Sequence, residues 1–100
     1  MKINIQSIHF KADHKLTEYV EKKLQKLETF YDGIIESNVF LKLDNNNKKD
    51  NKQVEIKIHV QNQSIFKTQT SQSFEAATDL AIDALKVQIK KYKDKLSSVS

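Results

Sequence analysis

The apolar residues of this chain change their spacing three times, and this change restricts the possible folds more than any other feature of the sequence. They alternate in Lys2–Phe10, recur every three or four residues over 13–31, alternate again over 39–70, and return to the longer spacing over 74–96. Alternation is typical of a half-buried strand, and steps of three and four are typical of an amphipathic helix. The spacing therefore predicts strand, helix, strands and helix, in this order.

The first strand and the helix after it have recognisable ends. In Lys2–Phe10 the apolar phase shifts after Ile5, which predicts a bulge near Ser7. Asp13 precedes the helix and can accept hydrogen bonds from the free amide groups of its first turn. Gly33, the only glycine, favours a left-handed residue that ends the helix. The helix is predicted over 13–31 with one apolar stripe, formed by Leu16, Val20, Leu24, Leu27 and Tyr31.

Three strands are predicted before the second helix. Val39–Leu43 and Val54–Val60 alternate cleanly, and the polar octet Asp44–Asn51 between them is typical of a solvated loop. A weaker strand over Ser64–Thr70 follows a turn at Gln61–Gln63, and its polar composition is typical of a sheet edge.

The second helix is predicted over Phe74–Leu96, with Ser73 as its N-cap. Its apolar residues recur at helical spacing and should face the sheet. This buried stripe is predicted to contain Phe74, Ala77, Ala81, Leu85, Ile89, Tyr92 and Leu96.

These elements predict an α+β domain of order β-α-β-β-β-α, with one four-stranded mixed sheet and both helices packed on one of its faces. A crossover helix joins the first two strands, so they should be parallel, whereas the last three strands form an antiparallel meander. One hundred residues suffice for one core. A single domain is therefore expected over 1–96, with a disordered tail at 97–100.

The sequence lacks the motifs that are typical of several function classes. There is no cysteine and only one glycine, so no thiolate zinc site, disulfide framework or phosphate-cradling loop is expected. His9, His14 and His59 do not form a metal-binding spacing with any carboxylate. We therefore expect a binding protein that is not an enzyme and has no metal or cofactor. No signal peptide or stretch of about 20 apolar residues is present, which favours a cytosolic chain.

Positive charge is concentrated in the second half of the last helix. The net charge is +4, all seventeen basic residues are lysines, and residues 86–96 hold five of them against one acid. Such a helix favours contact with a phosphate backbone, and the absence of arginine makes readout of base edges less expected. A solvated face is the competing interpretation, because the acids Glu75, Asp79 and Asp83 precede the lysines in the order that the helix dipole favours.

Short motifs along the whole chain resemble one protein family, in matching order and at matching separations. These motifs are Lys23–Glu28, Phe30–Asp32, Val39–Leu43, Ala76–Ala77 leading to Ile82–Asp83, and Lys91–Leu96. In these motifs the chain resembles the ribosome hibernation-promoting factors, a family that includes the ribosome-associated inhibitor and the sigma modulation proteins.

The resemblance implies the fold predicted above and a factor that binds the small ribosomal subunit, in the channel otherwise used by messenger and transfer RNA. Such a factor inhibits translation during slow growth or stationary phase. The resemblance assigns RNA contacts to Lys23, Lys26, Lys91, Lys93 and Lys95, and the charge pattern alone adds Lys22, Lys86 and Lys90.

The sequence also departs from the family pattern. Ala84 and Val87 stand where a lysine and an arginine often occur, and Gln61–Gln63 replaces a glycine-rich turn. The ending at Ser100 resembles the short form of the family, for which a separate ribosome modulation factor is a second candidate partner. No membrane or DNA partner is expected, and we expect a monomer.

Two other functions remain open at this point. A general double-stranded RNA-binding domain has a similar order of elements and reads RNA shape through lysines. A protein-interaction domain would instead recruit a partner along the weak fourth strand, or along an exposed apolar row formed by Leu80, Ala84 and Val87. Binding that weakens steeply with salt would favour RNA, and insensitivity to salt would favour a protein partner.

Overall fold

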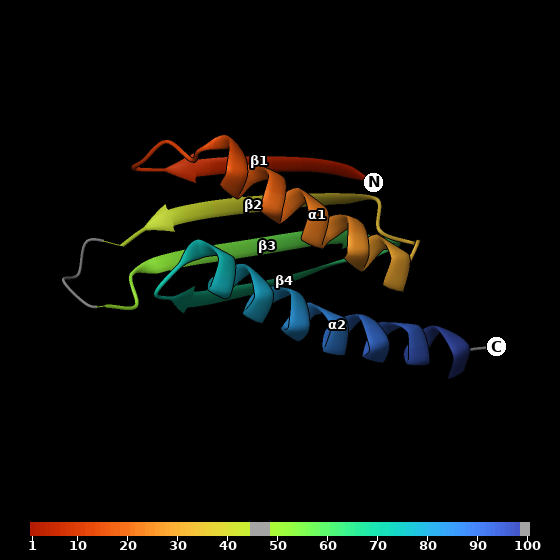
Figure 1. The fold of residues 1–100 in the computed structure, drawn as a ribbon. Helices are drawn as coiled ribbons and strands as arrows, with labels where there is room; N and C mark the ends of the chain where they lie inside the picture. The colour runs from red at the N-terminus through yellow and green to blue at the C-terminus, as the bar shows by residue number, and fades with distance from the viewer. Residues whose placement is uncertain (45–48, 99–100) are drawn as a thin grey trace.

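Two helices lie side by side on one face of a four-stranded sheet (Figure 1). The structure is a computed structural model that describes residues 1–44 and 49–98. The predicted fold is confirmed, including the order of its elements. These are β1 Lys2–Ile8, α1 His14–Phe30, β2 Glu36–Leu43, β3 Lys52–Val60, β4 Gln63–Ser71 and α2 Phe74–Ser98.

The strands follow one another across the sheet in chain order, β1-β2-β3-β4. β1 pairs with β2 in parallel, and the two later pairs are antiparallel, as predicted. β4 is an edge strand, which confirms the interpretation of its polar composition. The amide of Asp44 donates to the carbonyl of Asn51 (2.8 Å) and closes the connection from β2 to β3. Residues 45–48 of the predicted solvated loop lie outside the described residues.

The core forms where the inner face of the sheet meets the helices. On β3 the inward residues Val54, Ile56 and Ile58 are fully buried, whereas Glu55 and Lys57 between them lie on the open face. Both predicted helix stripes cover this inner face. The buried helix residues include Leu16, Val20, Leu24 and Leu27 from α1 and Ala77, Ala81, Leu85 and Ile89 from α2.

The buried surface of α2 differs from the predicted stripe at two places. Leu96 was expected in the core but is 52% exposed, because the last turns of α2 extend past the end of the sheet (Figure 1). Thr78 and Ile82 are buried and were not predicted, because α2 packs against α1 as well as against the sheet. The Thr78 hydroxyl donates a hydrogen bond to the carbonyl of Phe74 (2.7 Å).

Neither helix, over the residues described, is long and apolar enough to cross a membrane.

The predicted bulge near Ser7 is wrong. β1 pairs with β2 without interruption from Lys2 to Ile8. Ser7 keeps the inward phase beside buried Leu41, and Ile8 lies beside exposed Lys42 at the end of the strand. His9 then adopts a left-handed φ of 71° and turns the chain toward α1. Phe10 therefore lies outside the strand, and its ring stacks on Phe74 with the centroids 4.8 Å apart.

Both N-caps are confirmed, and the predicted helix-ending role of Gly33 is wrong. Asp13 Oδ1 accepts a hydrogen bond from the amide of Leu16 (2.8 Å), and Ser73 Oγ accepts one from Ala76 (3.0 Å). Gly33 does not have a positive φ, and α1 ends instead at Tyr31, whose backbone is extended. A Cβ at position 33 would overlap the Tyr31 ring, so that ring would have to move to accept any larger residue there.

Helix phase can be tested with two leucines of α2. Leu85 is fully buried, so Leu85→Ala should lower the free energy of unfolding by about 2–5 kcal/mol through lost burial and a cavity. Leu96→Ala is the matched control and should change it by less than about 0.5 kcal/mol, because Leu96 is exposed. Urea unfolding measures both values. Equal losses would contradict the placement of these two residues.

The close approach of Tyr31 to Gly33 gives a second prediction. Gly33→Ala should destabilise the fold by about 1–2 kcal/mol, because the added methyl displaces the Tyr31 ring from its edge-to-face contact with Tyr92. In a Tyr31→Ala background the same substitution should cost almost nothing. Thermal melting of the four proteins checks this, and an undiminished cost in the Tyr31→Ala background would show a backbone origin instead.

Candidate functional site

The two helices run in the same direction, and this places their basic flanks next to each other (Figure 1). On α1, residues Tyr19, Lys23 and Lys26 are three or four positions apart and share the side that faces α2. Glu28 lies on the opposite side, where its carboxylate pairs with the N-terminal ammonium of Met1 at 2.7 Å. The lysines of α1 are therefore directed toward α2.

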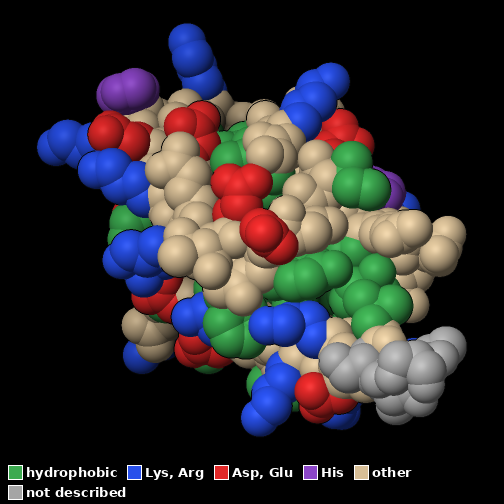
Figure 2. Space-filling model, turned by 90° about the vertical axis from the view of Figure 1, so that its right-hand side faces the viewer, with side chains coloured by type: hydrophobic (Ala, Val, Ile, Leu, Met, Phe, Trp, Pro, Cys, Tyr) green, Lys and Arg blue, Asp and Glu red, His purple; other side chains and the backbone are tan. Residues whose placement is uncertain are grey.

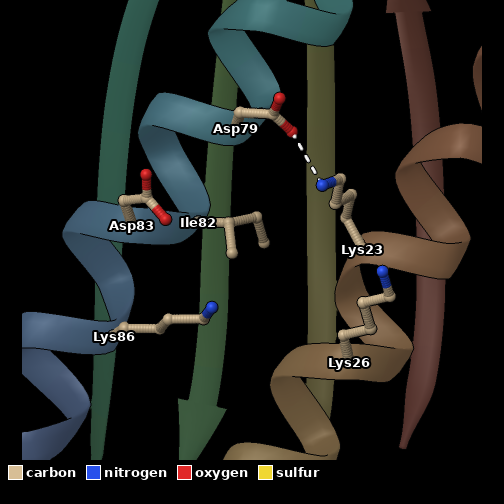
Figure 3. A pocket seen from close by; sticks show the side chains of 6 residues that line it. All are labelled: Lys23, Lys26, Asp79, Ile82, Asp83 and Lys86. Carbon is tan, nitrogen blue, oxygen red and sulfur yellow. Dashed lines mark ion pairs between the residues drawn. The ribbon is translucent and has the colours of Figure 1, made fainter.

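A groove of about 210 Å³ lies on the surface between α1 and α2. Lysines from both helices line it, and so do two carboxylates from α2. Figure 3 shows Lys86 extending from α2 toward α1, while Lys23 extends from α1 to Asp79. The lining residues are Lys23, Lys26, Asp79, Ile82, Asp83 and Lys86.

Asp79 joins the two helices at one end of this groove. Its Oδ1 lies 3.3 Å from Lys23 Nζ, and Tyr19 donates its hydroxyl to Oδ1 and Oδ2 at 2.8 and 3.0 Å. The hydrogen bond to Asp79 raises the pKa of both Tyr19 and Lys23, so the phenol stays neutral and the ammonium stays charged. Asp79 thus has two partners on α1, while its side chain remains 45% exposed to solvent.

A second hollow of about 200 Å³ continues the basic surface toward the start of α1. Lys15, Glu18, Tyr19 and Lys22 line it, and Lys22 Nζ lies 3.5 Å from Glu18 Oε1. Lys15 was not predicted as a site residue. Its position seven residues before Lys22, or two helical turns, is the sequence signal that places both lysines on one side.

The remaining lysines of α2 divide between its two flanks. Lys93 lies on the groove side, with Nζ 5.2 Å from the ring centroid of Phe30, and Lys90 follows Lys86 by one turn. Helical spacing places Lys91 and Lys95 on the other flank. The structure thus brings six of the eight predicted lysines to one side of the molecule, namely Lys22, Lys23, Lys26, Lys86, Lys90 and Lys93.

Lysine side chains gather on the helix-covered side of the molecule when it is viewed from the end where both helices stop (Figure 2). Carboxylates lie among them, so the surface is basic without being uniformly positive. This arrangement favours binding of an extended polyanion, because many moderate contacts between lysines and negative groups act together.

The other predicted features lie away from this groove. His59 is held on the open face of the sheet, with Nε2 3.3 Å from Asn38 Nδ2 and Nδ1 2.8 Å from Ser64 Oγ. Within the described residues, no three His, Cys, Asp or Glu side chains are grouped so that they could hold a metal ion. Leu80 and Val87 are 47% and 54% exposed, as expected for the apolar row on α2.

Comparison with known proteins gives the same fold and one family. Residues 3–97 match the model of the sigma 54 modulation protein / S30EA ribosomal protein family. The chain is 33% identical over 96 residues to a ribosome hibernation promoting factor of Escherichia coli (strain K12), covering 96% of this chain and 97% of that protein. It is 30% identical to a ribosome hibernation promotion factor of Bacillus subtilis (strain 168), covering 97% of this chain but 51% of that protein.

A solved structure agrees with these sequence matches. The Protein Y N-terminal domain of Thermus thermophilus superposes with a TM-score of 0.78 at 27% identity, covering 92% of this chain and 99% of that one. The family resemblance drawn from the sequence motifs is therefore confirmed. This chain belongs to the sigma 54 modulation protein / S30EA ribosomal protein family.

Proposed function

We propose that this protein is a ribosome hibernation factor that binds the small ribosomal subunit through the lysine-rich flanks of α1 and α2. Bound there, it would occupy the channel used by messenger and transfer RNA and inhibit translation during slow growth. The family supports the association with ribosomes, since its curated relatives are named ribosome hibernation promoting factors.

The observation that carries the proposal is the convergence of lysines from two helices on one groove. Lys23 and Lys26 come from α1 and Lys86 from α2, about 60 residues later in the chain, yet all three line the same space. Lys22 and Lys90 extend this surface along each helix. A groove with cations on both walls fits a phosphate backbone that runs between them, and such contacts depend on charge more than on sequence.

The two alternative functions are favoured less. Among the described residues, the lysines of the groove lie on helix flanks, whereas a double-stranded RNA-binding domain is expected to address two minor grooves from separate elements. The exposed row at Leu80 and Val87 would suit a protein partner, but nothing in the structure shows what would cover it.

Charge reversal on the groove side should remove binding. The double variant Lys26→Glu, Lys90→Glu changes two exposed lysines on the facing flanks of α1 and α2. We expect at least a tenfold loss of affinity for isolated small subunits, because each reversal replaces attraction to phosphate by repulsion. Circular dichroism should show unchanged melting.

The matched control reverses the same number of charges on the opposite face. Lys42 and Lys57 are exposed on the open face of the sheet, so Lys42→Glu, Lys57→Glu gives the same net charge as the groove variant. It should retain binding within about threefold, since only long-range attraction changes. Equal losses in both double variants would contradict the assignment of the helix-covered side.

Salt dependence tests whether phosphate contacts carry the binding. In co-sedimentation with separated small and large subunits, affinity for the small subunit should fall with a log-log slope of about 0.7–0.9 per phosphate contact. A generic RNA duplex in excess should not displace the protein. Displacement by the duplex would favour a general RNA-binding domain, and binding insensitive to salt would favour a protein partner.

A further inference from the structure

The lysine with the most defined position in the groove is already bound to a carboxylate. Lys23 Nζ lies 3.3 Å from Asp79 Oδ1 and 5.4 Å from the Tyr19 ring centroid, and its side chain is 32% exposed. Lys26 lies one turn further along α1 and is exposed to solvent. The two groove lysines of α1 therefore differ in how available they are to a phosphate.

The position of Asp79 is fixed independently of Lys23. The Tyr19 hydroxyl donates to both carboxylate oxygens, at 2.8 and 3.0 Å, and holds the carboxylate toward α1. The groove as a whole contains three lysines and two aspartates, which leaves one net positive charge. A phosphate that approached Lys23 would meet the negative charge of Asp79 at the same place.

We propose that Asp79 acts as an internal competitor for RNA phosphate at Lys23, and so keeps the affinity of the native chain below what its lysines would otherwise give. This inference rests on the proposed function and adds a residue that lowers the affinity for RNA. A carboxylate held against the ammonium offers the same charge-assisted hydrogen bond that a phosphate oxygen would offer. Lys23 then helps to hold the helices together and contributes less to RNA binding than it would if Asp79 carried no charge.

The proposal predicts an unusual result, namely that removing the charge of one groove residue strengthens binding. Asp79→Asn keeps an oxygen that can accept the Tyr19 hydroxyl, but it removes the charge that holds Lys23. The freed lysine adds one phosphate contact, so affinity for the small subunit should rise about threefold or more at low salt. The log-log salt slope should steepen by about 0.7–0.9.

A double-variant cycle shows whether the gain passes through Lys23. Lys23→Met should weaken binding in the native chain, and it should abolish the gain when combined with Asp79→Asn. A gain that persists in the combined variant would overturn the proposal. The charge control is Glu21→Gln, which raises the net charge equally at an exposed residue on the other side of α1. The proposal fails if Glu21→Gln tightens binding as much as Asp79→Asn does.

Thermal melting of each variant precedes the binding assay. If Asp79→Asn melts at a lower temperature than the native chain, Asp79→Ser provides the second variant, since serine removes the same charge and has a smaller side chain. The cycle is measured both on isolated small subunits and on a short single-stranded RNA. If the cycle shows coupling between Asp79 and Lys23 in binding to the RNA, but the protein does not bind the subunit, this inference stands and the ribosome is rejected as the partner. Subunit binding without such coupling would reject the inference alone.

Discussion

The inner face of β3, where Val54, Ile56 and Ile58 are fully buried, must be covered, and the arrangement of the rest of the molecule depends on this contact. A four-stranded sheet is too wide for a single helix about 10 Å across, so two helices have to share the covering. α2 packs on β3 and β4, α1 extends over β1, and the two helices pack against each other. Leu24 of α1 and Leu85 of α2 are completely buried as a result.

This packing has an electrostatic consequence. Because both helices run in the same direction, their C-terminal ends lie at the same end of the molecule, where helix dipoles attract cations (Figure 1). Their adjacent flanks carry lysines, and like charges brought together across a groove would oppose the packing. Asp79 offsets this repulsion by pairing with Lys23, and Tyr19 fixes the carboxylate in place. The same side chains that hold the helices together therefore limit how much positive charge is offered to a partner.

Local patterns were sufficient to predict most elements, but not features that depend on a distant contact. The spacing of apolar residues correctly predicted both helices and four strands, and Asp13 and Ser73 were correctly assigned as caps. Gly33 was misassigned because its φ is not positive, and the contact that distinguishes it is the approach of the Tyr31 ring. Leu96 matches the periodicity of the buried stripe, yet it is exposed, because the last turns of α2 extend past the end of the sheet.

The sequence by itself determined most of the residues that face inward in each element, because a side chain's direction follows from its position in a helix or strand. It also determined that the second half of the last helix is rich in lysine, with five lysines against one acid over residues 86–96. Only the tertiary structure decided which flank of α1 meets which flank of α2, because helical periodicity defines a face but not its neighbour. The bond from Tyr19 to Asp79 joins residues 60 positions apart. The groove between the helices, with three lysines and two aspartates, exists only once the sheet has placed them side by side.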